Sequence, residues 1–248
     1  MFHRRKGLPD DWEHIATEHI GAWDSFSSYE HDDLAGIADW LLRHKHWEAA
    51  NHFELNDEIV TTVAFEASVP ILALDTDFYR EVSAIVVFPT TIMSRGAYTG
   101  PVRGTVTSGV VPLLGQAHDR RGAILIAWDD AQSSALHPGH GRNVVFHEFA
   151  HKLDMLDDLT DGTPPLESKE QVDRWVEVCT PLYTALHEGY DRHPLDPYGG
   201  TSVAEFFAVA TEAFFDAPVQ LEQHQPDLFG ILRDFYKQDP AERARRIR

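Results

Sequence analysis

Apolar residues recur with a period near 3.6 through most of the first 75 positions, which is the spacing of one helix face. The clearest stripe lies in residues 32–47 and consists of Leu34, Ile37, Ala38, Leu41 and Leu42. A second predicted helix begins after Pro9, and a third, over residues 55–72, is apolar on more than one side and ends near Pro70. We therefore expect residues 1–75 to form a helical N-terminal region packed on the core.

Two short apolar runs then interrupt the helical pattern. Residues 84–88 are apolar, largely β-branched and closed by Pro89, and residues 123–128 form a similar run that ends in tryptophan. Such runs are typical of buried strands. The segment 96–109 between them is rich in Gly, Thr and Val and predicts loops or a hairpin. The sequence thus predicts a mainly helical α+β fold with a small sheet.

Helical patterns return after the turn-rich loop at residues 137–141. A helix is predicted over residues 143–154, and further helices open at Ser168, at Ser202 and near Pro226. No repeat or clear linker divides this part of the chain. We expect residues 76–248 to form one compact unit.

The amino-acid composition and net charge limit the classes of partner that the protein is expected to bind. The chain has 248 residues, of which 43% are hydrophobic and 25% are charged, and both are ordinary values for a globular protein. The formal net charge of −19 disfavours direct nucleic-acid binding, because phosphates would be repelled. The basic residues from Arg243 to Arg248 predict only a frayed, solvated tail.

The single cysteine, Cys179, excludes an intramolecular disulfide and fits a reducing compartment. It lies in an amphipathic pattern, so we expect it to have a packing role. The basic residues 4–6 are not followed by the apolar segment of a signal peptide. The most apolar stretch, residues 59–74, is too short to span a bilayer. These features predict a cytoplasmic protein without a membrane segment.

The predicted helix at residues 143–154 contains His147, Glu148 and His151 in the pattern H-E-x-x-H. Residues four apart share a helix face, so both imidazoles can bind one metal ion while Glu148 lies to one side. Zinc accepts imidazole ligands, and a carboxylate so placed can act as general base toward a zinc-bound water. The neighbouring residues are apolar, which favours this interpretation over a solvated helix face. The pattern predicts one Zn²⁺ per chain.

A catalytic zinc site usually has three protein ligands, so one more donor is needed. Asp157 is one candidate, although its approach to the metal requires a sharp chain reversal at Asp154. The other candidates are Glu205 and Glu212, which lie two turns apart on one face of the helix after Ser202, among phenylalanines. One of them would bind the metal, and the other would accept a hydrogen bond from a ligand imidazole. Spacing alone does not separate the two glutamates.

Two segments carry a more specific pattern. They are the run from His147 to Asp154, and Tyr198 followed seven residues later by Glu205-Phe-Phe-Ala-Val and then Glu212-Ala-Phe-Phe. Over residues 55–240 the chain resembles the Mlc titration factor A family, which are cytoplasmic zinc-dependent peptidases of the gluzincin type. The resemblance is weaker over the first 50 residues. It implies a zincin-like fold, similar to the catalytic domain of anthrax lethal factor, with the small sheet beside the active-site helix.

The resemblance also implies roles for individual residues. Glu205 would be the third zinc ligand beside His147 and His151, and Tyr198 would be an active-site group that helps to stabilise the oxyanion. Glu148 would then act as the general base in peptide hydrolysis.

Further expectations follow for the surroundings of the site. The resemblance also implies that residues 123–128 bind the main chain of a peptide or protein substrate. Asp154, one turn after His151, is a candidate acceptor for an imidazole N–H. The family resemblance implies a transcriptional repressor as a possible partner. The alternative function is a binding protein that sequesters such a regulator and keeps a structural or vestigial zinc site.

Overall fold

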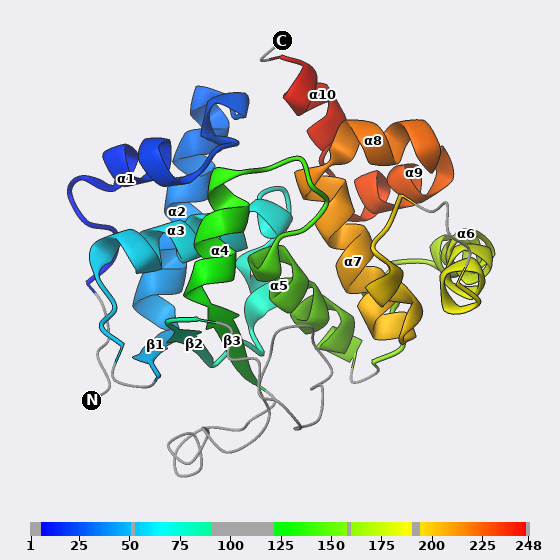
Figure 1. The fold of residues 1–248 in the computed structure, drawn as a ribbon, viewed down its shortest axis with the longest axis horizontal. Helices are drawn as coiled ribbons and strands as arrows, with labels where there is room; N and C mark the ends of the chain where they lie inside the picture. Colours follow the sequence, from blue (N-terminus) through cyan, green and yellow to red (C-terminus); the bar gives the residue numbers. More distant parts are fainter. Residues whose placement is uncertain (1–5, 51–52, 91–121, 158–159, 190–193, 247–248) are drawn as a thin grey trace. The chain divides into compact units, whose positions relative to one another are not determined.

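The computed structural model describes residues 6–50, 53–90, 122–157, 160–189 and 194–246 (Figure 1). The chain divides into two compact units by its internal contacts. Unit 1 comprises Met1–Val69 and Tyr79–His137, and unit 2 comprises Pro70–Phe78 and Pro138–Arg248. Within the described ranges, no helix has the length and apolarity needed to cross a membrane. The boundary at residue 75 expected from the sequence stays a prediction.

Unit 1 is built from helices and three short strands. Its elements are α1 (Trp12–His19), η1 (Trp23–Ser25), α2 (Ser28–His44), β1 (His46–Ala49), α3 (Asp57–Ser68), β2 (Ala84–Phe88), β3 (Ala123–Ala127) and α4 (Trp128–Leu136). Helix α2 begins at a capping box formed by Ser27 and Glu30. Helix α3 is buried along most of its length, and the buried positions include the polar residues Thr61, Thr62 and Glu66. The short turns η2 (Val69–Ile71) and η3 (Thr76–Tyr79) follow α3 in the chain.

The strands form a parallel sheet in the order β1-β2-β3. His46 pairs with Ala84, and Ala84 pairs in turn with Ala123. Strand β2 is central and buried at four of its five positions, as expected for a parallel strand covered on both faces. Strand β3 shows alternating burial at Ile124 and Ile126. The predicted α+β, mainly helical fold is confirmed, whereas the substrate-binding role of residues 123–128 stays a prediction.

Among its described residues, unit 2 contains helices and connecting loops but no strand. Its elements are α5 (Val144–Asp154), η5 (Met155–Asp157), α6 (Lys169–His187), η6 (Pro197–Gly200), α7 (Val203–Asp216), α8 (Pro218–His224), α9 (Pro226–Tyr236) and α10 (Pro240–Arg245). Helices α5 and α7 pack side by side (Figure 1). The buried ring of Phe214 contacts those of Phe229 and Tyr236, which fixes α7 against α9. The helix that carries Glu205 and Glu212 is therefore held by an aromatic core.

The structure corrects the sequence prediction at several elements. The first 75 residues are not wholly helical, because β1 follows α2 directly. Trp128 does not end a strand; it begins α4, where Asp129 and Asp130 occupy the first turn. Acidic side chains in the first turn of a helix interact favourably with the helix dipole, so Asp129 and Asp130 stabilise the beginning of α4. The segment 96–109, for which loops or a hairpin were predicted, lies outside the described residues.

The C-terminal region also contains more helix than predicted. Helices α8 and α10 were not expected, and both begin with proline at the first helical position, where its missing N–H costs nothing. Arg243 belongs to α10, is buried and donates a hydrogen bond to Gln238 Oε1. The prediction that a frayed tail begins at Arg243 is therefore wrong.

Candidate metal centre

Helix α5 begins at a buried cap. Asn143 Oδ1 accepts hydrogen bonds from the N–H groups of Val145 and Phe146, at 3.0 and 3.1 Å. Asn143 N–H itself donates to Glu212 Oε2 on α7, at 2.7 Å. Three N–H groups at the start of the motif helix therefore have acceptors, and one of these bonds ties the helix to α7.

His147, His151 and Glu205 come together between α5 and α7. Their candidate ligand atoms all lie within 4.8 Å of one another, and the group could hold a metal ion. The two imidazole Nε2 atoms are 3.2 Å apart. Glu205 Oε2 lies 3.0 Å from His147 Nε2 and 3.5 Å from His151 Nε2. The structure therefore brings together both histidines of the motif and one of the two candidate glutamates.

The chemistry and spacing of this trio fit a zinc ion. Two imidazole nitrogens and one carboxylate oxygen are donors that zinc accepts. Ligand atoms at about 2.0–2.1 Å from a tetrahedral ion are separated by about 3.3 Å from each other, which matches the observed distances. Glu205 Oε2 is buried and accepts no well-formed hydrogen bond among the described residues, so a cation would satisfy it.

Glu212 contacts the other side of the His147 ring. Its Oε1 lies 2.6 Å from His147 Nδ1, within a buried hydrogen bond. When Nδ1 donates to this carboxylate, Nε2 is left as the lone-pair nitrogen that faces His151 and Glu205. The two glutamates that sequence spacing did not separate therefore have different positions: Glu205 faces both Nε2 atoms, whereas Glu212 orients one ring.

The electrostatics of the trio favour a bound cation. Burial lowers the pKa of His147, but Glu205 and Glu212 on its two sides outweigh burial and raise this pKa to about 10. Burial raises the pKa of Glu205, but the nearby imidazoles of His147 and His151 outweigh it and lower this pKa to about 2. Both shifts have the same physical cause, which is the attraction between the imidazoles and the carboxylates beside them.

Glu148 is buried on α5 directly after the first histidine. Burial raises its pKa to about 7, against the opposing influence of His147 and Lys152. Its Oε1 is buried and has no hydrogen-bond partner among the described residues. A buried carboxylate with an unsatisfied oxygen is unfavourable for folding alone, which makes Glu148 a candidate for a chemical role.

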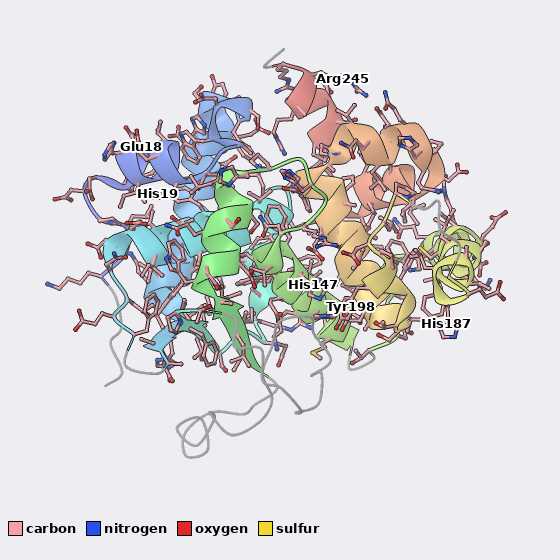
Figure 2. The ribbon with its side chains drawn as sticks, in the orientation of Figure 1. Glu18, His19, His147, His187, Tyr198 and Arg245 are labelled. Carbon is pink, nitrogen blue, oxygen red and sulfur yellow. The ribbon has the colours of Figure 1, made fainter. Side chains whose placement is uncertain are left out.

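Tyr198 lies on the turn η6, and its ring centroid is 6.2 Å from that of His147 (Figure 2). Asp196 caps this turn, because its Oδ1 accepts a hydrogen bond from Tyr198 N–H at 2.9 Å. The pattern Asp-Pro at residues 196–197, an N-cap followed by proline at the first turn position, was a sequence signal for this cap. The expected proximity of Tyr198 to the motif histidines agrees with this geometry.

The remaining residues singled out from the sequence are Asp154, Asp157 and Cys179. Asp154 is fully buried, and its Oδ1 accepts from Gly162 N–H at 2.9 Å rather than from a motif imidazole among the described contacts. The side chain of Asp157 lies outside the described residues. Burial raises the pKa of Cys179 to about 12, which agrees with the predicted packing role and leaves the sulfur as an unreactive thiol.

Sequence reasoning missed Asp216 at the end of α7. Its Oδ2 accepts backbone hydrogen bonds from Gly139, Gly141 and Arg142, the residues that lead into α5. The two glycines have φ values of +102° and +70°, a region that glycine adopts without strain, and this lets the loop curl around the carboxylate. A detectable signal was the spacing of Glu212 and Asp216, four residues apart on one helix face.

A motif helix whose two histidines face a glutamate from a second helix is the ligand arrangement of metallopeptidases of the H-E-x-x-H class. The sequence profile of the family described as glucose-regulated metallo-peptidase M90 matches residues 2–237, and the chain belongs to this family. The match begins at residue 2, so the similarity extends beyond the start near residue 55 that the motifs indicated.

Individual relatives cover most of the chain. An uncharacterized protein of Synechocystis sp. is 30% identical over 239 residues, which are 95% of this chain and 86% of that protein. Mlc titration factor A of Pectobacterium atrosepticum is 31% identical over 224 residues, covering 88% of this chain and 83% of the relative. Mlc titration factor A of Salmonella typhi is 29% identical over 242 residues, covering 95% and 89%.

Proposed function

We propose that this protein is a zinc-dependent peptidase in which His147, His151 and Glu205 bind the ion. The observation that carries the proposal is the spacing of the three donor atoms, which lie 3.0 to 3.5 Å from one another in a buried setting where no other group of the described residues bonds to Glu205 Oε2. Membership of a metallopeptidase family supports it. When bound, zinc supplies Lewis acidity that acidifies a water molecule and polarises a substrate carbonyl.

Glu148 and Tyr198 carry the remaining chemistry in this proposal. Glu148 accepts the proton of the attacking water at its carboxylate and then transfers it to the amine that leaves. Tyr198 donates a hydrogen bond from its hydroxyl to the substrate oxygen on which negative charge develops. Glu212 holds the His147 ring in one tautomer throughout.

The proposal is tested by digestion of a peptide library with and without a chelator. We expect cleavage by the metal-loaded protein, its loss after treatment with 1,10-phenanthroline, and its return when zinc is added back. Mass spectrometry of the products also distinguishes terminal from internal cleavage. A metal-loaded protein that leaves every peptide of the library intact would contradict the proposed function.

Tyr198→Phe is expected to lower kcat by about 10-fold to 100-fold while the zinc content stays at the wild-type value, because only one hydrogen bond to the transition state is removed. Steady-state kinetics and metal analysis on the same preparation measure both quantities. Tyr183→Phe, on α6, is the matched control and should leave kcat unchanged. Equal turnover in Tyr198→Phe and the wild-type protein would remove the hydroxyl from the mechanism.

A second candidate function is the binding of a transcriptional repressor. It rests on the name Mlc titration factor A, which several relatives carry. If repressor binding were the only function, the metal would be structural and the chain would only sequester the repressor. Structural zinc sites are usually closed by four protein ligands, whereas the group found among the described residues contains three. This difference favours catalysis, and the Glu148 variant discussed below separates the two functions.

A further inference from the structure

Arg142 lies in the loop that enters the motif helix, and its backbone is fixed from both sides. Its own N–H donates to Asp216 Oδ2 at 3.2 Å, and the N–H of the next residue, Asn143, donates to Glu212 Oε2 at 2.7 Å. Both carboxylates belong to α7. The position from which the Arg142 side chain extends is therefore set by the same helix that carries Glu205.

The guanidinium of Arg142 forms an ion pair with Asp196 Oδ2. The two side chains differ in environment, because that of Arg142 is 61% exposed whereas that of Asp196 is 10% exposed. The other carboxylate oxygen of Asp196, Oδ1, accepts the hydrogen bond from Tyr198 N–H. One nearly buried carboxylate thus connects the loop before α5 to the turn that carries Tyr198.

The other end of this turn has separate anchors. Thr201 donates to Tyr198 O from both its N–H and its hydroxyl, at 3.0 and 2.7 Å. His187 lies at the end of α6 (Figure 2). Its Nδ1 is 2.9 Å from Gly200 O. These contacts hold residues 198–201, whereas Asp196 fixes the entry of the turn. A change at Arg142 therefore affects the entry and leaves the other anchors intact.

We propose that Arg142 is a positioning residue, which rests on the proposed function, and that it fixes the Tyr198 turn beside the metal centre by pairing with Asp196. The physical reason is the burial of Asp196. A carboxylate with little exposure keeps its bonds to Arg142 and to Tyr198 N–H while the arginine neutralises it, and loss of that positive charge favours rotation of the carboxylate toward water. Rotation toward water breaks the bond to Tyr198 N–H and loosens the entry of the turn that positions the ring facing His147.

This role differs from that of an ordinary surface ion pair. An exposed arginine adds little to global stability, so Arg142→Gln should hardly change the Tm of the protein. Glutamine keeps the backbone N–H that binds Asp216, so the loop itself stays in place. The expected effect is local to residues 196–198. Arg246→Gln is the matched control, because Arg246 is also exposed and pairs with Glu242 on α10.

The first measurement is hydrogen–deuterium exchange of the whole protein, followed on peptides that contain residues 194–201. Loss of one charge-assisted contact should speed exchange at the Tyr198 amide by about 10-fold in Arg142→Gln. Arg142→Lys should restore most of the protection, and Arg246→Gln should match the wild-type protein. This readout requires neither metal nor substrate. Unchanged exchange in Arg142→Gln would overturn the proposal, whatever the activity of the protein is.

The second measurement is a double-mutant cycle with Tyr198→Phe, using a peptide identified in the library digest. Arg142→Gln alone should lower kcat by about 10-fold with little change in KM and in zinc content. In the Tyr198→Phe background the same change should cost nothing further, because the hydroxyl that it positions is gone. Additive losses would overturn the link through Tyr198. A wild-type protein without chelator-sensitive cleavage would refute the proposed function instead, and the exchange result would then decide the role of Arg142.

Discussion

Replacing Glu148 with glutamine is expected to abolish most of the hydrolysis and to leave the metal bound. The amide has nearly the same size and shape as the carboxylate, but it cannot accept a proton from water. Loss of a general base typically lowers the rate by about 10² to 10⁴-fold. Glu148 is not a member of the group that could hold the ion, so zinc content should stay at the wild-type value. Measurements of kcat and of zinc per chain by inductively coupled plasma mass spectrometry test both parts.

Glu177→Gln is the matched control for this prediction. Glu177 lies on α6 and is exposed, so the variant carries the same change of charge away from the site. It should keep the wild-type kcat. A metal-loaded Glu148→Gln with full activity would remove Glu148 from the mechanism, and a metal-free one would make it a ligand. If both functions reside in the chain, the inactive variant should still bind a repressor partner, whereas activity and binding would be inseparable if cleavage were needed for recognition.

The sequence predicted the motif helix well because its signals are local. The polar residues of H-E-x-x-H stand in an apolar helical run, and Asn143 provides the cap. Helix spacing alone then places His147 and His151 on one face. The pairing of this helix with α7 is a tertiary contact, and it was expected from a family resemblance rather than from spacing.

The distinction between Glu205 and Glu212 illustrates what spacing cannot decide. Seven residues apart, both point to the same side of α7. Their different roles depend on the position along α7 at which α5 packs, because His147 lies between the two glutamates. Its Nε2 faces Glu205, and its Nδ1 faces Glu212. No periodicity in a single segment contains that offset.

The missed elements were short and depended on contacts with distant residues. Strand β1 has only Trp47 as a large buried apolar residue, so four residues could not indicate a strand without the neighbouring β2. The role of Asp216 depends on backbone N–H groups in a loop about 75 residues earlier in the chain, and a backbone N–H has no side-chain signature in the sequence. Acceptors for loop backbones are therefore the part of this site that sequence patterns reveal least.

Glu205→Ala is expected to lose the metal, whereas Glu212→Ala should keep most of it. The first change removes one of three donor atoms and leaves two imidazoles to hold the ion. The second removes the acceptor for His147 Nδ1, and loss of such an outer partner typically weakens metal affinity by about 10 to 100-fold, which a modest excess of zinc overcomes. Zinc per chain after dialysis, and competition with a chromogenic chelator, measure the two losses.

The two variants form a matched pair, because each removes one buried glutamate from the same helix. Glu205 is 3% exposed and Glu212 is 8% exposed, so both changes create a similar cavity and a similar loss of packing. Any difference in zinc content between them therefore reflects ligation rather than general destabilisation, provided that circular dichroism shows both to be folded. A zinc-free Glu212→Ala beside a zinc-loaded Glu205→Ala would move the third ligand two helical turns along α7. Wild-type zinc content in both variants would mean that neither glutamate is the third ligand.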